Sequence, residues 1–93
     1  MEGKDRKVNG LNNLEFEVID QLYLIIPYAA LRSKIGAGLD EALTGLLRKK
    51  YVKQLQTGGP SGYEEKFDPD LEKLDGYHYL ATKQGMMVQN GMV

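Results

Sequence analysis

A run of regularly spaced leucines between residues 39 and 50 limits the possible folds more than any other feature of the sequence. The apolar side chains of this stretch recur every three or four residues and therefore fall on one face of a helix. They are Leu39, Ala42, Leu43, Leu46 and Leu47. Acidic residues stand near the start of the stretch and basic residues near its end, where the helix dipole favours each sign. The pattern predicts an amphipathic helix from Leu39 to about Lys50.

Two more helices are predicted before this one. The first begins after a capping asparagine at position 12 or 13, has apolar residues at helical spacing as far as Ile25, and ends before Pro27. Because proline is acceptable at a helix start, Pro27 opens a second helix over residues 28–35. A Gly-Ala-Gly turn then leads into helix 39–50. Two helices joined by a short glycine-containing turn match the helix-turn-helix unit.

Two β-strands are predicted after the third helix. Residues 51–55 alternate in polarity as a strand does, and residues 77–82 read as the strand that returns to pair with them. Between the two strands lies a wing insert over about residues 56–76. It contains a glycine-rich loop and an acidic stretch, residues 63–75, which we expect to be mostly mobile apart from one helical turn.

The two ends of the chain receive simpler predictions. Residues 1–11 have no apolar period and are expected to form a flexible arm. Thr82 is expected to cap a last helical turn over residues 83–90. Residues 12–93 then form one domain. The predicted fold class is α+β, a winged helix-turn-helix with a three-helix core and a two-stranded β-hairpin as its wing.

The composition argues against several functional classes. There is no cysteine, which excludes disulfides and thiolate metal sites. His78 is the only histidine and has no clustered ligands, base or nucleophile beside it in the sequence, so we expect no metal, no cofactor and no enzymatic activity. No apolar run approaches the roughly 20 residues that cross a bilayer. The polar first ten residues do not resemble a signal peptide, so a cytoplasmic protein that avoids membranes is expected.

The charge is distributed unevenly along the chain, although the net charge is only -1. Residues 32–53 carry six basic side chains against two acidic ones, whereas residues 54–75 carry six acidic side chains against two basic ones. Such asymmetry points to a charged partner. The acidic stretch has three open interpretations: it covers the basic region, it docks a basic protein, or it is a solubilising loop without a partner.

Two sequence motifs resemble the winged-helix transcriptional regulators of the MarR and PadR type. One is Gly38-Leu39-x-x-x-Leu43-x-x-Leu46-Leu47-x-x-x-Tyr51-Val52, and the other is Tyr77-His78-Tyr79-Leu80-Ala81-Thr82-Lys83-Gln84-Gly85. The resemblance covers roughly residues 13–90 and implies a bacterial protein that binds DNA and regulates transcription. This sequence departs from those families in Ala81 before Thr82, in its long acidic insert, and in having no counterpart of their long dimerisation helix.

The candidate interface with double-stranded DNA is built around helix 39–50 as the recognition helix. Basic side chains would contact phosphates or guanine edges, with one threonine on the same helix face. The candidate residues are Arg32, Lys34, Thr44, Arg48, Lys49, Lys50 and Lys53. Asp40, Glu41 and Gly45 are expected on the same exposed surface.

The main alternative is a winged-helix module that binds protein and not nucleic acid. The acidic insert would then be the docking surface for a basic partner. The methionine-rich C-terminus, which includes Met86, Met87 and Met92, packs either under the first helix or against a second copy, so a homodimer is also a candidate.

Overall fold

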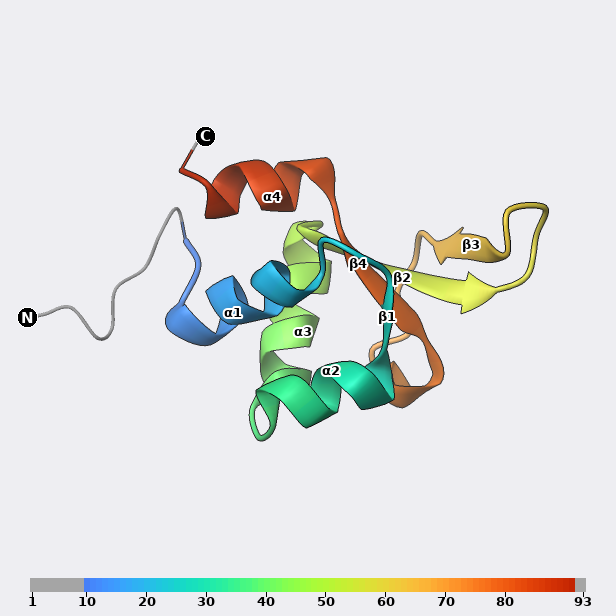
Figure 1. Ribbon diagram of the computed structural model, residues 1–93, viewed down its shortest axis with the longest axis horizontal. Helices are drawn as coiled ribbons and strands as arrows, with labels where there is room; N and C mark the ends of the chain where they lie inside the picture. The colour runs from blue at the N-terminus through green and yellow to red at the C-terminus, as the bar shows by residue number, and fades with distance from the viewer. Residues whose placement is uncertain (1–9, 92–93) are drawn as a thin grey trace, which may run out of the picture.

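The protein combines α-helices with one antiparallel β-sheet of four strands (Figure 1). A computed structural model describes residues 10–91. The elements in chain order are α1 (Asn13–Gln21), β1 (Ile26–Pro27), α2 (Tyr28–Ile35), α3 (Leu39–Lys49), β2 (Val52–Thr57), β3 (Tyr63–Lys66), the 3-10 turn η1 (Leu74–Gly76), β4 (His78–Ala81) and α4 (Lys83–Gln89). This confirms an α+β architecture.

Helix α1 begins at a capping box, as a terminal asparagine predicts. The Asn12 side chain accepts a hydrogen bond from the Glu15 N–H at 2.8 Å, and the Glu15 carboxylate accepts one from the Asn12 N–H at 3.1 Å. The prediction that apolar residues extend this helix to Ile25 is wrong, since it ends at Gln21. The next residues lead to β1, where Pro27, which lacks an N–H, sits on an edge strand.

Helices α2 and α3 agree closely with the prediction. All five apolar residues of α3 predicted to face the core are buried. Gly38 joins the helices with φ of +92°, and a Cβ at this position would lie 2.8 Å from the Leu14 side chain. Glycine meets both demands, because it tolerates positive φ and needs no side-chain space. The turn between α2 and α3 is therefore packed against the Leu14 side chain of α1.

The sheet is larger than the predicted two-stranded hairpin. Its strand order is β1-β4-β2-β3, so β2 pairs with β4 as expected and also with β3. The acidic stretch expected to be mostly mobile therefore contributes a strand, Tyr63–Lys66. Its charged residues suit an edge position, where they oppose pairing with other chains. Strand β1 adds the opposite edge through Ile26 and Pro27.

The segment after β3 is also held in place by hydrogen bonds. The prediction that the acidic stretch is mostly mobile is therefore wrong for this segment as well. The Gln54 side chain accepts a hydrogen bond from the Asp70 N–H at 2.7 Å and donates one to the Asp70 carbonyl at 3.1 Å. The Tyr79 hydroxyl donates to the Leu74 carbonyl at 2.6 Å. Burial raises the pKa of Tyr79 well above its usual value, so this hydroxyl remains a donor.

The two faces of the sheet have different surroundings. Side chains of directly paired residues lie on the same face. The inner face carries Ile26, Val52, Gln54, Tyr79 and Ala81, and most of these pack into or against the helical core. The outer face carries Lys53, Leu55, Tyr63, Glu65, His78 and Leu80, none of which belongs to or packs against that core.

The two ends of the described region are packed. Leu11 is fully buried, so the folded part begins before the predicted boundary at residue 12, and residues 1–9 of the expected arm lie outside the described range. Thr82 caps α4 by accepting from the Gly85 N–H, as predicted. Met86 packs against the core, whereas Met92 lies outside the described residues. Within residues 10–91, every helix is too short or too polar to cross a membrane.

Candidate nucleic-acid interface

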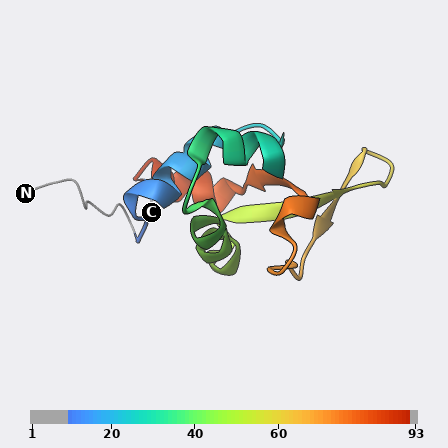
Figure 2. The same cartoon turned by 90° about the horizontal axis from the view of Figure 1, so that it is seen from below.

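Helix α3 presents one side to solvent next to the hairpin formed by β2 and β3. Figure 2 shows α3 projecting from the body on the side away from α2, with β3 and the segment after it on that same side. We call the solvent-facing residues Asp40, Glu41, Thr44 and Arg48 the α3 strip; Thr44 is half-buried and the others are exposed. Asp40 and Glu41 stand about one helical turn before Thr44, and Thr44 stands one turn before Arg48, which places all four on one side of the helix.

The N-terminal end of the α3 strip is acidic and attached to α2. The Tyr28 hydroxyl donates a hydrogen bond to the Asp40 carboxylate at 2.6 Å. This bond, helped by partial desolvation, raises the pKa of Tyr28, while nearby Arg32 acts in the opposite direction. Asp40 is therefore held near α2, and its charge, with that of Glu41, opposes the approach of phosphate at this end.

Lys49 and Gly45 lie on the side of α3 that faces α1, next to the α3 strip. The Lys49 ammonium lies 3.3 Å from both Glu15 carboxylate oxygens and donates to the Gly10 carbonyl at 3.1 Å. A Cβ at Gly45 would come within 2.8 Å of Glu15 Oε2, so this glycine also faces α1. The Glu15 side chain is only 7% exposed. Lys49, whose side chain remains 39% exposed, therefore compensates a nearly buried carboxylate.

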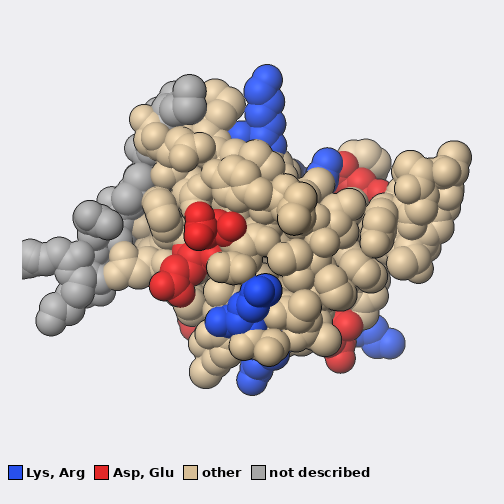
Figure 3. Space-filling view, viewed as in Figure 1, with Lys and Arg blue, Asp and Glu red and all other residues tan. Residues whose placement is uncertain are grey.

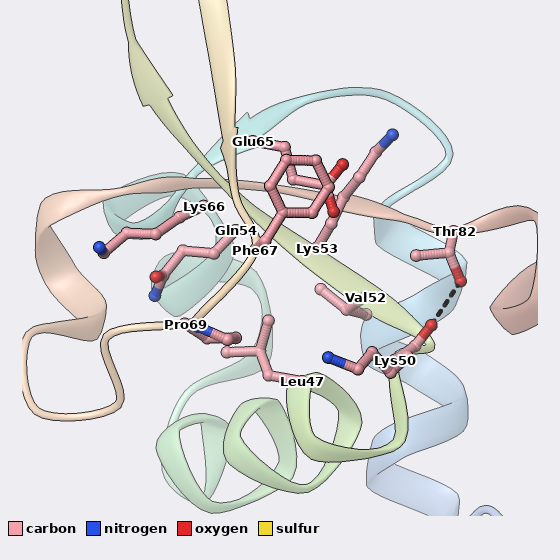
Figure 4. A pocket seen from close by; sticks show the side chains of 10 residues that line it. All are labelled: Leu47, Lys50, Val52, Lys53, Gln54, Glu65, Lys66, Phe67, Pro69 and Thr82. Atoms are coloured by element: carbon pink, nitrogen blue, oxygen red, sulfur yellow. Dashed lines mark hydrogen bonds between the residues drawn. The ribbon is translucent and has the colours of Figure 1, made fainter.

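Three other lysines surround a hollow of about 80 Å³ where α3 meets the sheet (Figure 4). They are Lys50, Lys53 and Lys66, and none of them forms an ion pair within residues 10–91, where Lys49–Glu15 is the sole pair. The hollow is closed below by Leu47 and Pro69. Lys50 has a positive φ of 67° as the C-cap of α3, and its carbonyl accepts a hydrogen bond from the Thr82 hydroxyl at 2.8 Å.

Lys53 borders this hollow from the outer side of the sheet, unlike the other candidate residues. It belongs to the outer face of the sheet, and Figure 4 shows it with Glu65 and Phe67 on the side of β2 away from α3. The reason is the alternation of side chains along β2, which turns Lys53 away from its neighbours Val52 and Gln54.

The candidate residues on α2 form a separate basic area. Arg32 and Lys34 are exposed in the last turn of that helix. On the face seen in Figure 3, basic side chains gather over α2 and acidic side chains over α1. The seven candidates therefore divide into Thr44, Arg48 and Lys50 around α3, Arg32 and Lys34 on α2, a paired Lys49, and Lys53 on the outer face.

The sequence reasoning missed Lys66 and Phe67. Lys66 contributes a third cation to the hollow, and Phe67 is 79% exposed beside it. The alternation of Tyr63, Glu65 and Phe67 was the available signal, because it is the period of a strand. The acidic composition of the surrounding stretch concealed that signal.

Protein-family models, curated proteins and solved structures gave no match to this chain. Its function must therefore be inferred from its own residues.

Proposed function

We propose that the protein is a winged helix-turn-helix protein that binds double-stranded DNA with α3 as its recognition helix. The order of elements supports this proposal: a short β1 between α1 and α2 pairs with the last strand, and the α2–α3 unit precedes the hairpin. The single observation that carries it is the solvent-facing side of α3, which lies beside the β2–β3 hairpin while its opposite side is buried (Figure 2). A helix of this size fits the major groove.

Individual residues then take different roles in this interface. Arg48 has the length and the forked donors needed to reach a guanine edge, and Thr44 lies one turn earlier on the same side. Lys50 and Lys66 contact phosphates at the C-terminal end of α3. Arg32 and Lys34 provide phosphate contacts from α2. Regulation of transcription in a bacterial cytoplasm is the cellular role proposed for such a protein.

A protein-binding module is the second candidate, and a specific observation favours it. Asp40 and Glu41 occupy the start of the α3 strip, and the segment with Asp68, Asp70 and Glu72 is anchored to the sheet close to α3, since Pro69 and Leu47 share the hollow. These carboxylates repel phosphate and attract a basic protein surface. In the DNA-binding proposal the basic C-terminal end of the α3 strip dominates binding. In the protein-binding proposal its acidic N-terminal end dominates.

Fluorescence anisotropy of a labelled mixed-sequence duplex separates the two functions. At about 50 mM salt the protein is expected to bind, and the affinity should fall steeply as salt rises, because each phosphate contact adds about -0.9 to the logarithmic slope. An Arg48→Ala/Lys50→Gln variant should lose most of the affinity, whereas Lys83→Gln on α4 serves as a control that removes a positive charge away from α3. Absence of binding at low salt would reject the DNA proposal and favour the protein-binding module.

A further inference from the structure

The outer face of the sheet carries an apolar stripe that reaches from β1 to β3. Side chains alternate between faces along a strand, so Ile25 and Phe67 continue the outer face beyond Ile26 and Lys66. The stripe runs through Ile25, Leu80, Lys53 and Phe67, of which Ile25 is 37% and Phe67 79% exposed. Leu80 and Lys53 between them are half-buried, so the stripe has exposed apolar side chains at both of its ends, and exposed apolar surface of this kind can serve as an interaction surface.

The other half of the outer face is already closed by its own side chains. The rings of Tyr63 and His78 come from strands on either side of β2, and their centroids lie 5.1 Å apart. They therefore meet above Leu55, which is only 5% exposed although it is outside the helical core. This half of the outer face is therefore packed by its own side chains, and it lies beside the exposed stripe.

The charges on the outer face are balanced and unpaired. Lys53 and Glu65 lie diagonally on neighbouring strands, yet they form no ion pair with each other or with any other residue of the described region. Figure 4 shows both side chains next to Phe67. One positive and one negative group on the same apolar surface give it no net attraction for a polyanion or for a strongly basic partner.

We propose that the outer face is the interface of a homodimer. A two-fold axis brings the same surface of each copy together, so a residue on one copy meets a different residue on the other, and the reverse contact forms at the same time. On this surface, we place the two-fold axis so that Lys53 of each copy lies opposite Glu65 of the other, with Phe67 buried between the two pairs and Leu80 beside Lys53. A second copy of the chain can pair with both charged side chains and cover the apolar stripe at the same time.

Dimerisation through the outer face leaves α3 free. Helix α3 packs on the inner side of the sheet, so its solvent-facing strip stays exposed in both copies. The dimer does not depend on DNA binding, and its test contains no nucleic acid. Failure of one proposal is therefore distinguishable from failure of the other.

Sedimentation-velocity ultracentrifugation of the full chain tests the dimer directly. Between about 5 and about 500 µM the wild type is expected to show a reversible monomer–dimer equilibrium that depends on concentration. Phe67→Ser should weaken the dimer at least about tenfold, because it removes the central apolar contact. Its thermal melting at monomeric concentration should stay close to wild type, since Phe67 is 79% exposed within one copy.

Charge reversal gives the sharper test of the two-fold arrangement. Lys53→Glu and Glu65→Lys should each weaken the dimer about tenfold or more, because each creates two contacts between like charges. The Lys53→Glu/Glu65→Lys double variant should restore most of the wild-type affinity. The swap of exposed Glu72 and Lys73 is the control and should change nothing. A monomer at all concentrations, a dimer insensitive to these variants, or a double variant as weak as the single ones would overturn the proposal.

Discussion

Replacing Lys49 tests whether this residue stabilises the fold rather than contacting a partner. In the structure its ammonium lies 3.3 Å from both oxygens of Glu15, whose side chain is 7% exposed, while Lys49 itself is 39% exposed. Exposed ion pairs contribute up to about 1 kcal/mol, and removing one partner of a fully buried pair costs about 3–5 kcal/mol. The burial of this pair is intermediate between those two cases, because Glu15 is nearly buried and Lys49 is exposed. Lys49→Met is therefore expected to lower the free energy of unfolding by about 1–2 kcal/mol.

Urea unfolding followed by circular dichroism measures this effect. With a slope of about 1 kcal/mol per molar urea for a chain of this size, the midpoint should fall by about 1–2 M. A Glu15→Gln/Lys49→Met double variant should recover part of the loss, since the amide still caps Asn12 but no longer carries an unpaired charge. The matched control is Lys83→Met, at an exposed lysine of α4 without an ion pair in the described residues. If Lys49→Met costs no more than this control, the structural role assigned to Lys49 is wrong.

Three further substitutions test the packing, each measured by the same unfolding assay. Leu43→Ala, at a fully buried position of α3, should cost about 2–5 kcal/mol, and a cost below about 1 kcal/mol would mean that this helix is rotated. Gly85→Ala should cost at least about 2 kcal/mol, because the new Cβ would lie 2.1 Å from the Tyr51 carbonyl oxygen. Gln54→Leu should cost about 1–3 kcal/mol and speed hydrogen exchange at the Asp70 amide; unchanged exchange would refute the anchoring of that segment.

Much of the helical structure follows from local sequence rules. The boundaries of α2 and α3, the cap at Asn12 and the cap at Thr82 depend on apolar spacing and on side chains within one turn. Strand β1 could not be found in this way, because its two residues continue an apolar run that has helical spacing. Strand β1 forms because it pairs with β4, and this pairing is a contact between segments far apart in the sequence.

The candidate site was predictable only in part, for the same reason. Arg48 and Lys49 are neighbours in the sequence and have the same charge, yet one faces solvent and the other reaches Glu15 on α1. A turn of about 100° per residue separates them on the helix. Which of the two meets a buried carboxylate depends on how α1 crosses α3, and that crossing is not encoded in local spacing.

Chemical-shift mapping by NMR tests the central claim most directly. When a short mixed-sequence duplex is added to labelled protein at about 50 mM salt, the amides of Thr44, Arg48 and Lys50 should shift most, and the shifts should fade as salt increases. Amides of the outer face, such as those of Leu80 and Phe67, should stay in place. Unchanged spectra, or shifts confined to the outer face, would contradict DNA recognition by α3.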